Sequence, residues 1–447
     1  MRTPERPGPP GGSRRPDYPI STHTLDNGMR VAVSEDHLVP QVSINLWVDV
    51  GSRHEVAGST GLAHLFEHLM FEGSEHVAEG EHFRALMGHG GHCNATTSFD
   101  RTTYAESLPV GAFDLALWLE ADRHRRLLPA LTQANLDNQR DVVVQEKQQR
   151  YDNQPYGDAF QRMCGAVFPV DHPYRHTPIG EMEDLLGASL EGVHAFYRAH
   201  YGARTSTLSV VGAVRPPEVV ELAERYFGGS GDHTVARRAL RPALAPLEEP
   251  TWTHVAGPVP SERSYTCFRL PAVTDPEFLS AGMALDVLAG LSVSPLHQRL
   301  VRRDETATAC GAAGLGLVEG TSLSYVAVDV LPDSSAEAVD TAVCEELERL
   351  ADQGPTPVQH RAAVAGAQRS YAEALAATDE RAELLARSTV VHGDPDHLNS
   401  YPDLVGSLTP EDIARAARTW LAPQSRAVLV YRDAAAVTAR PGREGAA

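Results

Sequence analysis

The sequence predicts an α+β protein built from two homologous α/β domains, each with a mixed or antiparallel sheet packed against helices. Three observations lead to this prediction. At 447 residues, the chain is too long for one ordinary hydrophobic core. In both halves, segments with the two-residue period of strands alternate with longer helical segments. The end of the first half, "VHAFYRAHYGARTSTLSVVGAV", also resembles the end of the second, "ARAARTWLAPQSRAVLVYRDA", which indicates an internal duplication.

Composition sets the expected domain boundaries. Pro, Gly and Arg dominate the first residues, so 1–20 are predicted to be a disordered tail. Residues 230–250 are rich in Gly, Pro, Ala and Arg and have no apolar period, which is typical of a linker. We therefore expect an N-terminal domain at 21–229, a C-terminal domain at 251–435 and a flexible tail at 436–447.

The first half begins with strand patterns. After a turn at Asn27-Gly28, alternating apolar residues at 31–33 and 42–48 fit two antiparallel strands. The segment "GLAHLFEHLMFEGSEH" at 61–76 is predicted to be a helix. The Thr and Tyr content of 90–109 predicts a pair of strands. The remaining elements expected in this half are helices at about 110–163 and 181–200, a strand at 208–211 and a helix ending at Gly228.

The second half repeats this plan. The segments "SYTCFRLPAV" and "TSLSYVAVDVLP" are predicted to be strands because of their β-branched and aromatic residues. Helical periods place three long helices after and between them, at about 276–303, 334–353 and 357–391.

Charge and composition narrow the class of function. With 39 basic and 59 acidic residues, the formal charge of −20 argues against nucleic acid or an anionic membrane as the main partner. No apolar run is long enough to cross a bilayer and no secretory h-region is present, so we expect a cytoplasmic protein without a membrane partner. The 5 scattered cysteines indicate neither a disulfide framework nor a cysteine zinc site.

The helix at 61–76 carries the pattern HxxEH. On a helix, His64 and His68 are four residues apart and can direct their rings to one point, while Glu67 flanks that point. Two imidazoles are half of a tetrahedral zinc site. Catalytic zinc usually has three protein ligands and one water, and a nearby free carboxylate is the natural base for that water. The alternative is an ordinary amphipathic helix on which these histidines have no special role.

A third candidate ligand follows the apolar run "RDVVV". Glu146 lies on the helix after this run. HxxEH followed at this distance by such a glutamate resembles the inverzincin peptidases, the family of pitrilysin, insulysin and mitochondrial processing peptidase. The resemblance covers about 25–435 and is stronger in the first half. The other stretches that match the family in order are "GSRHE", "FEGSEH", "GGHCNATTSFDRTTY", "NQPYG" and "HPYRHTPIGEMEDL".

The resemblance implies a zinc peptidase and assigns roles by position. It implies Zn²⁺ as the cofactor and Glu67 as the general base. It also implies that Asn94 and Ala95 lie on an edge strand, to which a peptide substrate adds as an extra strand. The residues that resemble the zinc ligands are His64, His68 and Glu146.

The sequence departs from the family pattern in two places. Where the family often has a second glutamate near the metal, this chain has Gln139, whose amide we expect to hydrogen-bond near the site and to tune zinc binding. In the second half, Val301 and Thr308 occupy the positions of a family arginine and tyrosine. Neither residue could stabilise an oxyanion or hold a substrate carbonyl as that pair does.

The missing pair has a meaning within the family. Some members are two-subunit enzymes in which one chain binds zinc, the other supplies the Arg/Tyr pair, and the two close like a clam around a chamber. This chain resembles the zinc-binding subunit of the bacterial type, so we expect a homologous non-zinc partner and short unstructured peptides or leader segments as substrates. The alternatives are a catalytically silent structural or assembly subunit and a self-sufficient homodimeric peptidase.

Weaker candidates lie near the motif. His89 and His92 flank two glycines and could bind a metal or simply belong to a turn. Tyr151, Asp152 and Tyr156 could line the site or cap the helix that carries Glu146.

Overall fold

A computed structural model of the chain describes residues 17–229 and 240–434. Residues 1–16 and 436–447 of the predicted tails, and 230–239 of the predicted linker, lie outside the described residues. Within the predicted N-terminal tail, the backbone N–H of Tyr18 donates to Asn399 Oδ1 at 3.0 Å. Residues 240–250 contain no helix or strand.

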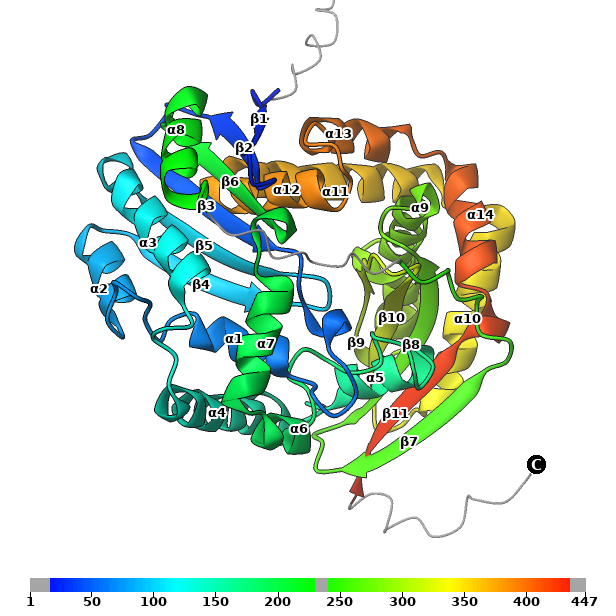
Figure 1. The fold of residues 1–447 in the computed structure, drawn as a ribbon. Helices are drawn as coiled ribbons and strands as arrows, with labels where there is room; N and C mark the ends of the chain where they lie inside the picture. The colour runs from blue at the N-terminus through cyan, green and yellow to red at the C-terminus, as the bar shows by residue number, and fades with distance from the viewer. Residues whose placement is uncertain (1–16, 230–239, 435–447) are drawn as a thin grey trace, which may run out of the picture.

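The first half contains a six-stranded mixed sheet (Figure 1). Its strands are β1 (Ser21–Thr24), β2 (Arg30–Glu35), β3 (Gln41–Val48), β4 (His92–Thr97), β5 (Thr102–Pro109) and β6 (Ser206–Gly212). They lie in the order β1-β2-β6-β3-β5-β4, and only β2 and β6 run parallel.

The sequence correctly places five of these strands, misses the edge strand β1, and does not predict all of the neighbours. The turn at Asn27-Gly28 joins β1 to β2. The segments we predicted as an antiparallel pair, β2 and β3, do not hydrogen-bond to each other, because β6 lies between them. Every residue of β6 is buried, and a strand that is buried on both faces belongs in the middle of a sheet.

Apart from α2, which was not predicted, the helices of the first half follow the predicted positions but are shorter. The segment 110–163 is divided into three helices, because Thr132 caps a new helix and a loop at 153–158 ends it. A π-helical turn at Gln148–Asp152 continues the middle one. The helices are α1 (Leu62–Leu69), α2 (Glu81–Gly88), α3 (Phe113–Arg126), α4 (Gln133–Lys147), α5 (Ala159–Val167), α6 (Met182–Gly187), α7 (Leu190–His200) and α8 (Pro216–Phe227).

The second sheet repeats the topology of the first. Its strands are β7 (Thr251–Gly257), β8 (Glu262–Pro271), β9 (Ala307–Leu315), β10 (Thr321–Val330) and β11 (Ala427–Asp433). The order β7-β11-β8-β10-β9, with only β7 and β11 parallel, matches β2-β6-β3-β5-β4. This match agrees with the predicted duplication. Sequence patterns missed the edge strands β7 and β9, whose residues are largely exposed or small.

Helices complete the second half. The predicted helix at 276–303 is interrupted, because Ser294 Oγ accepts the backbone N–H of Leu291 and Pro295 follows, so that π-helical turns stand at Asp286–Gly290 and His297–Arg303. The helices are α9 (Pro276–Leu285), α10 (Ala336–Gln353), α11 (Pro357–Ala376), α12 (Thr378–Val390), α13 (His397–Ser407) and α14 (Pro410–Trp420). None of the described helices is long and apolar enough to cross a membrane.

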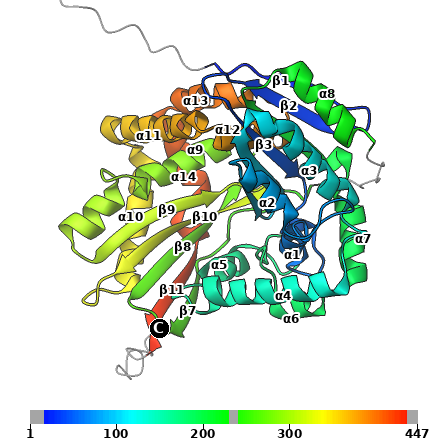
Figure 2. The same cartoon turned by 90° about the vertical axis from the view of Figure 1, so that its left-hand side faces the viewer.

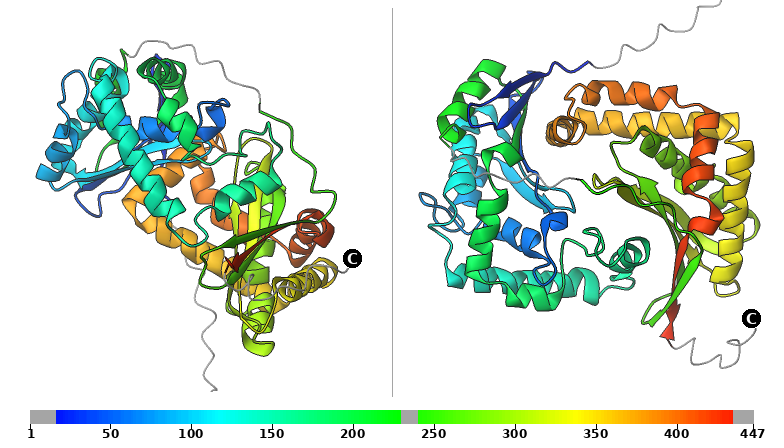
Figure 3. Two further views of the ribbon diagram at one scale, coloured as in Figure 1. Left: turned by 90° about the horizontal axis from the view of Figure 1, so that it is seen from below. Right: turned by 45° about the vertical axis from the view of Figure 1, so that its right-hand side comes forward.

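Helices of its own half cover one face of the first sheet, and a helix of the second half covers the other. Figure 2 shows α3 and α8 side by side over the first face. Successive residues of β6 face opposite ways, so that Val210 packs in the core of the first half while Val211 packs with Ala382 and Leu385 of α12. In Figure 3, right, the orange helices of the second half reach over the first sheet.

The second sheet is covered in the reciprocal way. One face packs against α9, α10 and α14 of the same half. On the other face, Met163 and Cys164 of α5 pack with Cys267 of β8 and Leu429 of β11. The two halves therefore complete each other's cores and form one interlocked body.

A buried cluster of charged side chains connects α3 to β5 of the first sheet. The side chain of Arg123 is 2% exposed, contacts the Glu120 carboxylate and lies 3.8 Å from Glu106 Oε1. Its guanidinium lies over the rings of Phe71 and Tyr104, at 4.6 Å from each centroid. Because buried carboxylates without a cation are costly, this junction depends strongly on Arg123, and His82 Nε2 also lies 2.8 Å from Glu106 Oε1.

Replacing this arginine should destabilise the fold strongly. We expect Arg123→Met to lower the free energy of unfolding by about 3–5 kcal/mol, because it leaves two buried carboxylates without their cation. Arg126→Met, on the same helix but with a side chain that is 43% exposed, is the matched control. Equal urea midpoints for the two variants would contradict the assignment.

Candidate metal centre

The N-terminal end of α1 is held by a buried carboxylate. Glu55 accepts the backbone N–H of Gly61 at 2.9 Å and of Ala63 at 2.7 Å. Its Oε2 also lies 2.9 Å from His176 Nε2. A carboxylate at this end complements both the unpaired N–H groups and the helix dipole, so it fixes where α1 begins.

A close approach between two loops completes this anchor. Gly61 and Gly180 both have positive φ angles, +84° and +70°. A Cβ atom at Gly180 would stand 2.3 Å from the nitrogen of Gly61, which excludes any side chain there. Thr60 joins the same loops, because its hydroxyl donates to Asp184 at 2.7 Å. The stretches "GSRHE" and "HPYRHTPIGEMEDL" thus meet at the N-terminal end of α1.

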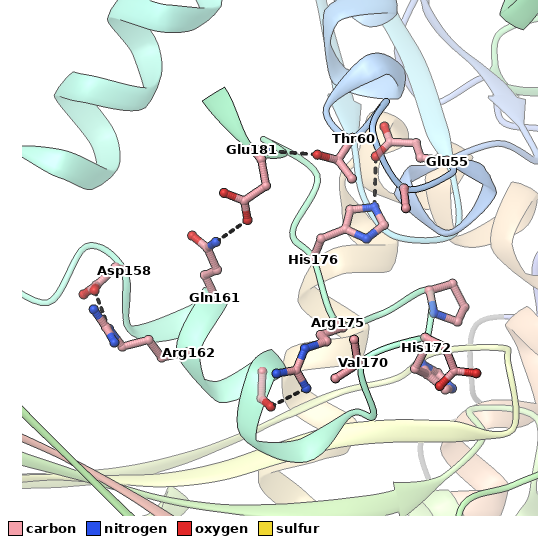
Figure 4. Close-up of a pocket in the computed structure, with 14 residues that line it drawn as sticks. Glu55, Thr60, Asp158, Gln161, Arg162, Val170, His172, Arg175, His176 and Glu181 are labelled. Atoms are coloured by element: carbon pink, nitrogen blue, oxygen red, sulfur yellow. Dashed lines mark hydrogen bonds and ion pairs between the residues drawn. The ribbon is translucent and has the colours of Figure 1, made fainter. Parts of the chain in front are cut away.

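A cavity of about 570 Å³ lies beside this anchor (Figure 4). Its walls come from α5, the loop at 170–181 and the segment before α1. Polar groups on these walls are paired with each other: Asp158 with Arg162, and Gln161 with Glu181. The cavity is separate from the histidines of α1, none of which lines it.

Three side chains that could bind a metal meet where α1 packs against α4. The rings of His64 and His68 have centroids 4.8 Å apart. Glu146 Oε2 lies 3.7 Å from His64 Nε2 and 3.3 Å from His68 Nε2. The candidate ligand atoms all lie within 4.8 Å of one another. Two imidazoles and one carboxylate fit the donor set of a catalytic zinc site.

The charge states of His64 and Glu146 suit a cation, whereas the ring of His68 must lose a proton to bind one. Burial, together with the neighbouring His68, lowers the pKa of His64 to about 4, so this ring is neutral at pH 7. Burial opposes protonation of His68, yet its hydrogen bond to Glu146 and the charge of Glu67 raise its pKa overall. The same hydrogen bond lowers the pKa of Glu146, which favours the carboxylate.

Glu67 is fixed by the neighbouring strand β4. Thr97 Oγ1 donates to Glu67 Oε2 at 2.6 Å. The only other hydroxyl near Thr97 among the described residues is Thr102, which gives its own proton to the carbonyl of Val50 at 2.9 Å. The proton of Thr97 is therefore directed to Glu67. Burial raises the pKa of Glu67, while this hydrogen bond works in the opposite direction.

The predicted substrate residues lie on the edge of the first sheet. Asn94 and Ala95 belong to β4, where they pair with Ala105 and Tyr104 of β5. Among the described residues no other strand pairs with β4, so its outer edge is open. Because α1 contacts β4, this edge lies next to the histidine cluster.

Gln139 lies on α4, two helical turns before Glu146. Its Nε2 donates to Glu72 Oε1 at 2.5 Å. Sequence reasoning placed Gln139 near the site but missed Glu72, because nothing in "FEGSEH" shows which side chain this glutamate meets.

The other candidates lie outside the cluster. His89 Nδ1 contacts the carbonyl of Ala85 at 2.8 Å, at the end of α2, and His92 is exposed on β4. Asp152 pairs with Lys147 at 2.8 Å. The remaining two are Tyr151, which packs against the core of the first half, and Tyr156, whose hydroxyl donates to the carbonyl of Ser261 at 2.7 Å and so joins the halves.

In the second half, positions 301 and 308 carry neither a cation nor a phenol. Val301 packs against the core of the second half, in the π-helical segment before β9. Thr308 is exposed on β9, with its hydroxyl 3.4 Å from the carbonyl of Asp329.

Comparisons with known proteins divide the chain into two parts. The model described as insulinase (peptidase family M16) matches residues 30–168, and the one described as peptidase M16 inactive domain matches 187–366. All members of the histidine cluster lie in the first part. In the second part, α9 follows β8 as α1 follows β3, and it contains no histidine.

The chain is also similar to curated relatives and to a solved structure. Zinc protease PqqE of Helicobacter pylori is 33% identical over 205 residues, 46% of each chain. Mitochondrial-processing peptidase subunit beta of Rattus norvegicus is 28% identical over 231 residues, 50% of this chain and 44% of that one. The matches thus span slightly less than half the length of these curated relatives. The crystal structure of a protease from Helicobacter pylori superposes with a TM-score of 0.85 at 25% identity, covering 93% of this chain and 99% of that one.

Removing the carboxylate anchor of α1 should be costly. We expect Glu55→Ala to lower the free energy of unfolding by about 1–3 kcal/mol, because it leaves buried N–H groups of Gly61 and Ala63 unpaired. Glu79→Ala, at an exposed position after α1, should change it by less than about 0.5 kcal/mol. Urea unfolding of both variants checks this, and equal stabilities would argue against the anchor.

Proposed function

Because the chain belongs to the insulinase family, peptidase family M16, we propose that it is a zinc-dependent metalloendopeptidase subunit. Its expected substrates are short unstructured peptides or leader segments of precursors. The observation that carries this proposal is the meeting of His64, His68 and Glu146 around one point, with the carboxylate of Glu67 beside it.

The proposed ligands are the two histidines of α1 and the glutamate of α4. A zinc ion bound there would supply a Lewis acid that lowers the pKa of a water molecule and polarises the substrate carbonyl. In this proposal Glu67 takes the proton of the attacking water and passes it to the leaving amine. The hydroxyl of Thr97 holds one oxygen of Glu67 in place during this transfer, so the geometry of the base depends on β4.

Substrate orientation is proposed to come from the open edge of β4. A peptide that adds there as an extended strand forms hydrogen bonds through its main chain, so affinity depends little on its sequence. The backbone at Asn94 and Ala95 would then place the scissile bond beside the histidine cluster. This mode requires an extended substrate, which favours short or unfolded peptides over folded proteins.

A homologous partner is the second part of the proposal. Val301 and Thr308 cannot donate to an oxyanion as an arginine and a tyrosine can, so we propose that another subunit supplies these groups. The name of the rat relative, a beta subunit, supports a paired arrangement. This chain would then be half of a clam-shell chamber. Its cytoplasmic location stays a prediction.

A catalytically silent subunit is the second candidate. The description of residues 187–366 as an inactive domain favours it. The histidine cluster lies outside that part of the chain, at residues matched by the insulinase model. A scaffold has no physical need for a carboxylate held beside two histidines, so we prefer the peptidase.

The base assignment is tested by Glu67→Gln. We expect the variant to bind zinc as the wild-type chain does, because Glu67 is not a proposed ligand, and to cleave peptides about 10²–10⁴-fold more slowly. Metal analysis and turnover of a fluorogenic peptide by the paired subunits provide the measurement. A variant that kept its full rate would show that another group is the base.

The partner requirement is tested by measuring the chain with and without a homologue that carries the Arg/Tyr pair. We expect one zinc per chain and slow cleavage by the chain alone. Addition of the homologue should raise the rate about 10²–10³-fold, the usual effect of an oxyanion donor. Cleavage at the full rate by the chain alone would favour a self-sufficient homodimer. A chain that binds no zinc would contradict the proposed peptidase function.

A further inference from the structure

The turn of the β4–β5 hairpin, at 98–101, meets the corresponding turn of the second half. Because the second sheet repeats the topology of the first, β9 and β10 correspond to β4 and β5, and the residues that join them are 316–320. The backbone N–H of Val318 donates to Asp100 Oδ2 at 3.2 Å. The edge strands β4 and β9 are therefore connected through their turns.

One tyrosine hydroxyl joins these two turns. Tyr174 lies in the loop at 170–181 and is fully buried. Its hydroxyl donates to Asp100 Oδ1 at 2.5 Å. The same oxygen accepts the backbone N–H of Glu319 at 2.9 Å and shares that of Val318, at 3.2 Å, with Asp100. A hydroxyl has one proton and two lone pairs, so this contact uses its full hydrogen-bonding capacity.

A buried arginine supplies the charge that the contact needs. Arg53 is 8% exposed, and its Nε lies 3.1 Å from Asp100 Oδ1. Its Nη1 donates to Glu319 Oε1 at 3.1 Å, and the side chain of Glu319 is 2% exposed. The guanidinium thus lies between two carboxylates, one from each turn. Because a buried carboxylate without a cation is costly, both turns depend on the same arginine.

The strand that leads into this contact carries parts of the proposed site. Thr97, whose hydroxyl donates to Glu67, is three residues before Asp100. Asn94 and Ala95 lie on the same strand. Among the described residues β4 pairs with β5 alone, and a strand with one neighbour opens more readily than the centre of a sheet. Loss of the contact at the turn should therefore loosen β4 before it loosens the rest of the sheet.

We propose that Tyr174 is a positioning residue of β4, which fixes this strand for an incoming peptide by joining its turn to the corresponding turn of the second half. The proposal rests on the proposed function, since it takes β4 as the edge to which the substrate adds. It also gives the second half a part in the site, although the histidine cluster contains no residue of that half.

The first test measures hydrogen–deuterium exchange of the metal-free full chain. Tyr174→Phe keeps the ring, whose centroid lies 5.5 Å from that of Phe99 in the turn, and removes only the hydroxyl. We expect the amides that pair β4 with β5 to exchange about 10-fold faster, because the turn loses hydrogen bonds to a buried charge and to two N–H groups. Amides of β6, at the centre of the sheet, should exchange as in wild type.

Tyr156→Phe is the matched control. Its hydroxyl donates to the carbonyl of Ser261 at 2.7 Å, so it also connects the two halves, but it does not bond to either turn. We expect exchange in β4 to stay within about twofold of wild type in this variant, because local opening depends on local contacts. The comparison separates a hold on the turn from a general loosening between the halves.

The second test measures peptide turnover by the paired subunits. Tyr174→Phe should raise KM about 10-fold with a smaller change in kcat, because the loosened strand binds the peptide less well. Zinc affinity should stay within about twofold of wild type, because the variant leaves the proposed ligands and their partners unchanged. A residue needed only for folding would instead lower the fraction of active enzyme and leave KM unchanged.

The outcomes separate the inference from the proposed function. Faster exchange in β4 and a higher KM for Tyr174→Phe, but not for Tyr156→Phe, support the inference. Unchanged exchange, an equal change in both variants or an unchanged KM overturns it. If thermal unfolding shows that Tyr174→Phe is not folded, Asp100→Asn takes its place in the same comparison. Wild-type protein that cleaves no peptide contradicts the proposed function. Peptide affinity, measured by fluorescence anisotropy, then replaces KM, and equal affinity in wild type and Tyr174→Phe overturns the inference.

Discussion

The histidine cluster depends on the anchoring of one short helix. A helix of eight residues has little stability of its own, so α1 takes its place from the groups at its ends. At its start the buried carboxylate of Glu55 accepts two of its N–H groups, and after its end Glu72 binds α4. Because α4 brings Glu146, the same two carboxylates set the distance between the histidines and their third partner. The chemistry therefore rests on groups that need not touch the substrate.

The chemistry at the centre was predictable where it depends on local spacing. The four-residue interval of His64 and His68 places both rings on one helical face in any fold that keeps the helix. Glu146 needed the family resemblance, because spacing alone does not bring two distant helices together. Thr97 and Glu72 could not be predicted, since a threonine on a strand and a glutamate in a turn have many ordinary roles. Their partners are decided by packing between elements.

The fold, too, was predictable only where it depends on local sequence patterns. Alternation and helical period located most elements, and the similar ends of the two halves predicted the repeated topology. These patterns do not predict which strands are neighbours in the sheet, as the position of β6 between β2 and β3 shows. Apolar residues on both faces of β6 and β8 indicate that both faces are buried, but not what buries them. The helix α5 packs on the sheet of the second half, and α12 packs on the sheet of the first. These tertiary contacts leave no periodic signal in the sequence.

This exchange affects how the chain can fold during synthesis. When β6 leaves the ribosome, the first sheet has all its strands but lacks the helix that covers its second face. The face that includes Ala32 and Val211 stays open to solvent until residues 378–390 have been made. At ordinary rates of translation this delay is on the order of ten seconds or more. For that time the nascent protein exposes an apolar surface, which makes it a natural client for a chaperone that acts at the ribosome.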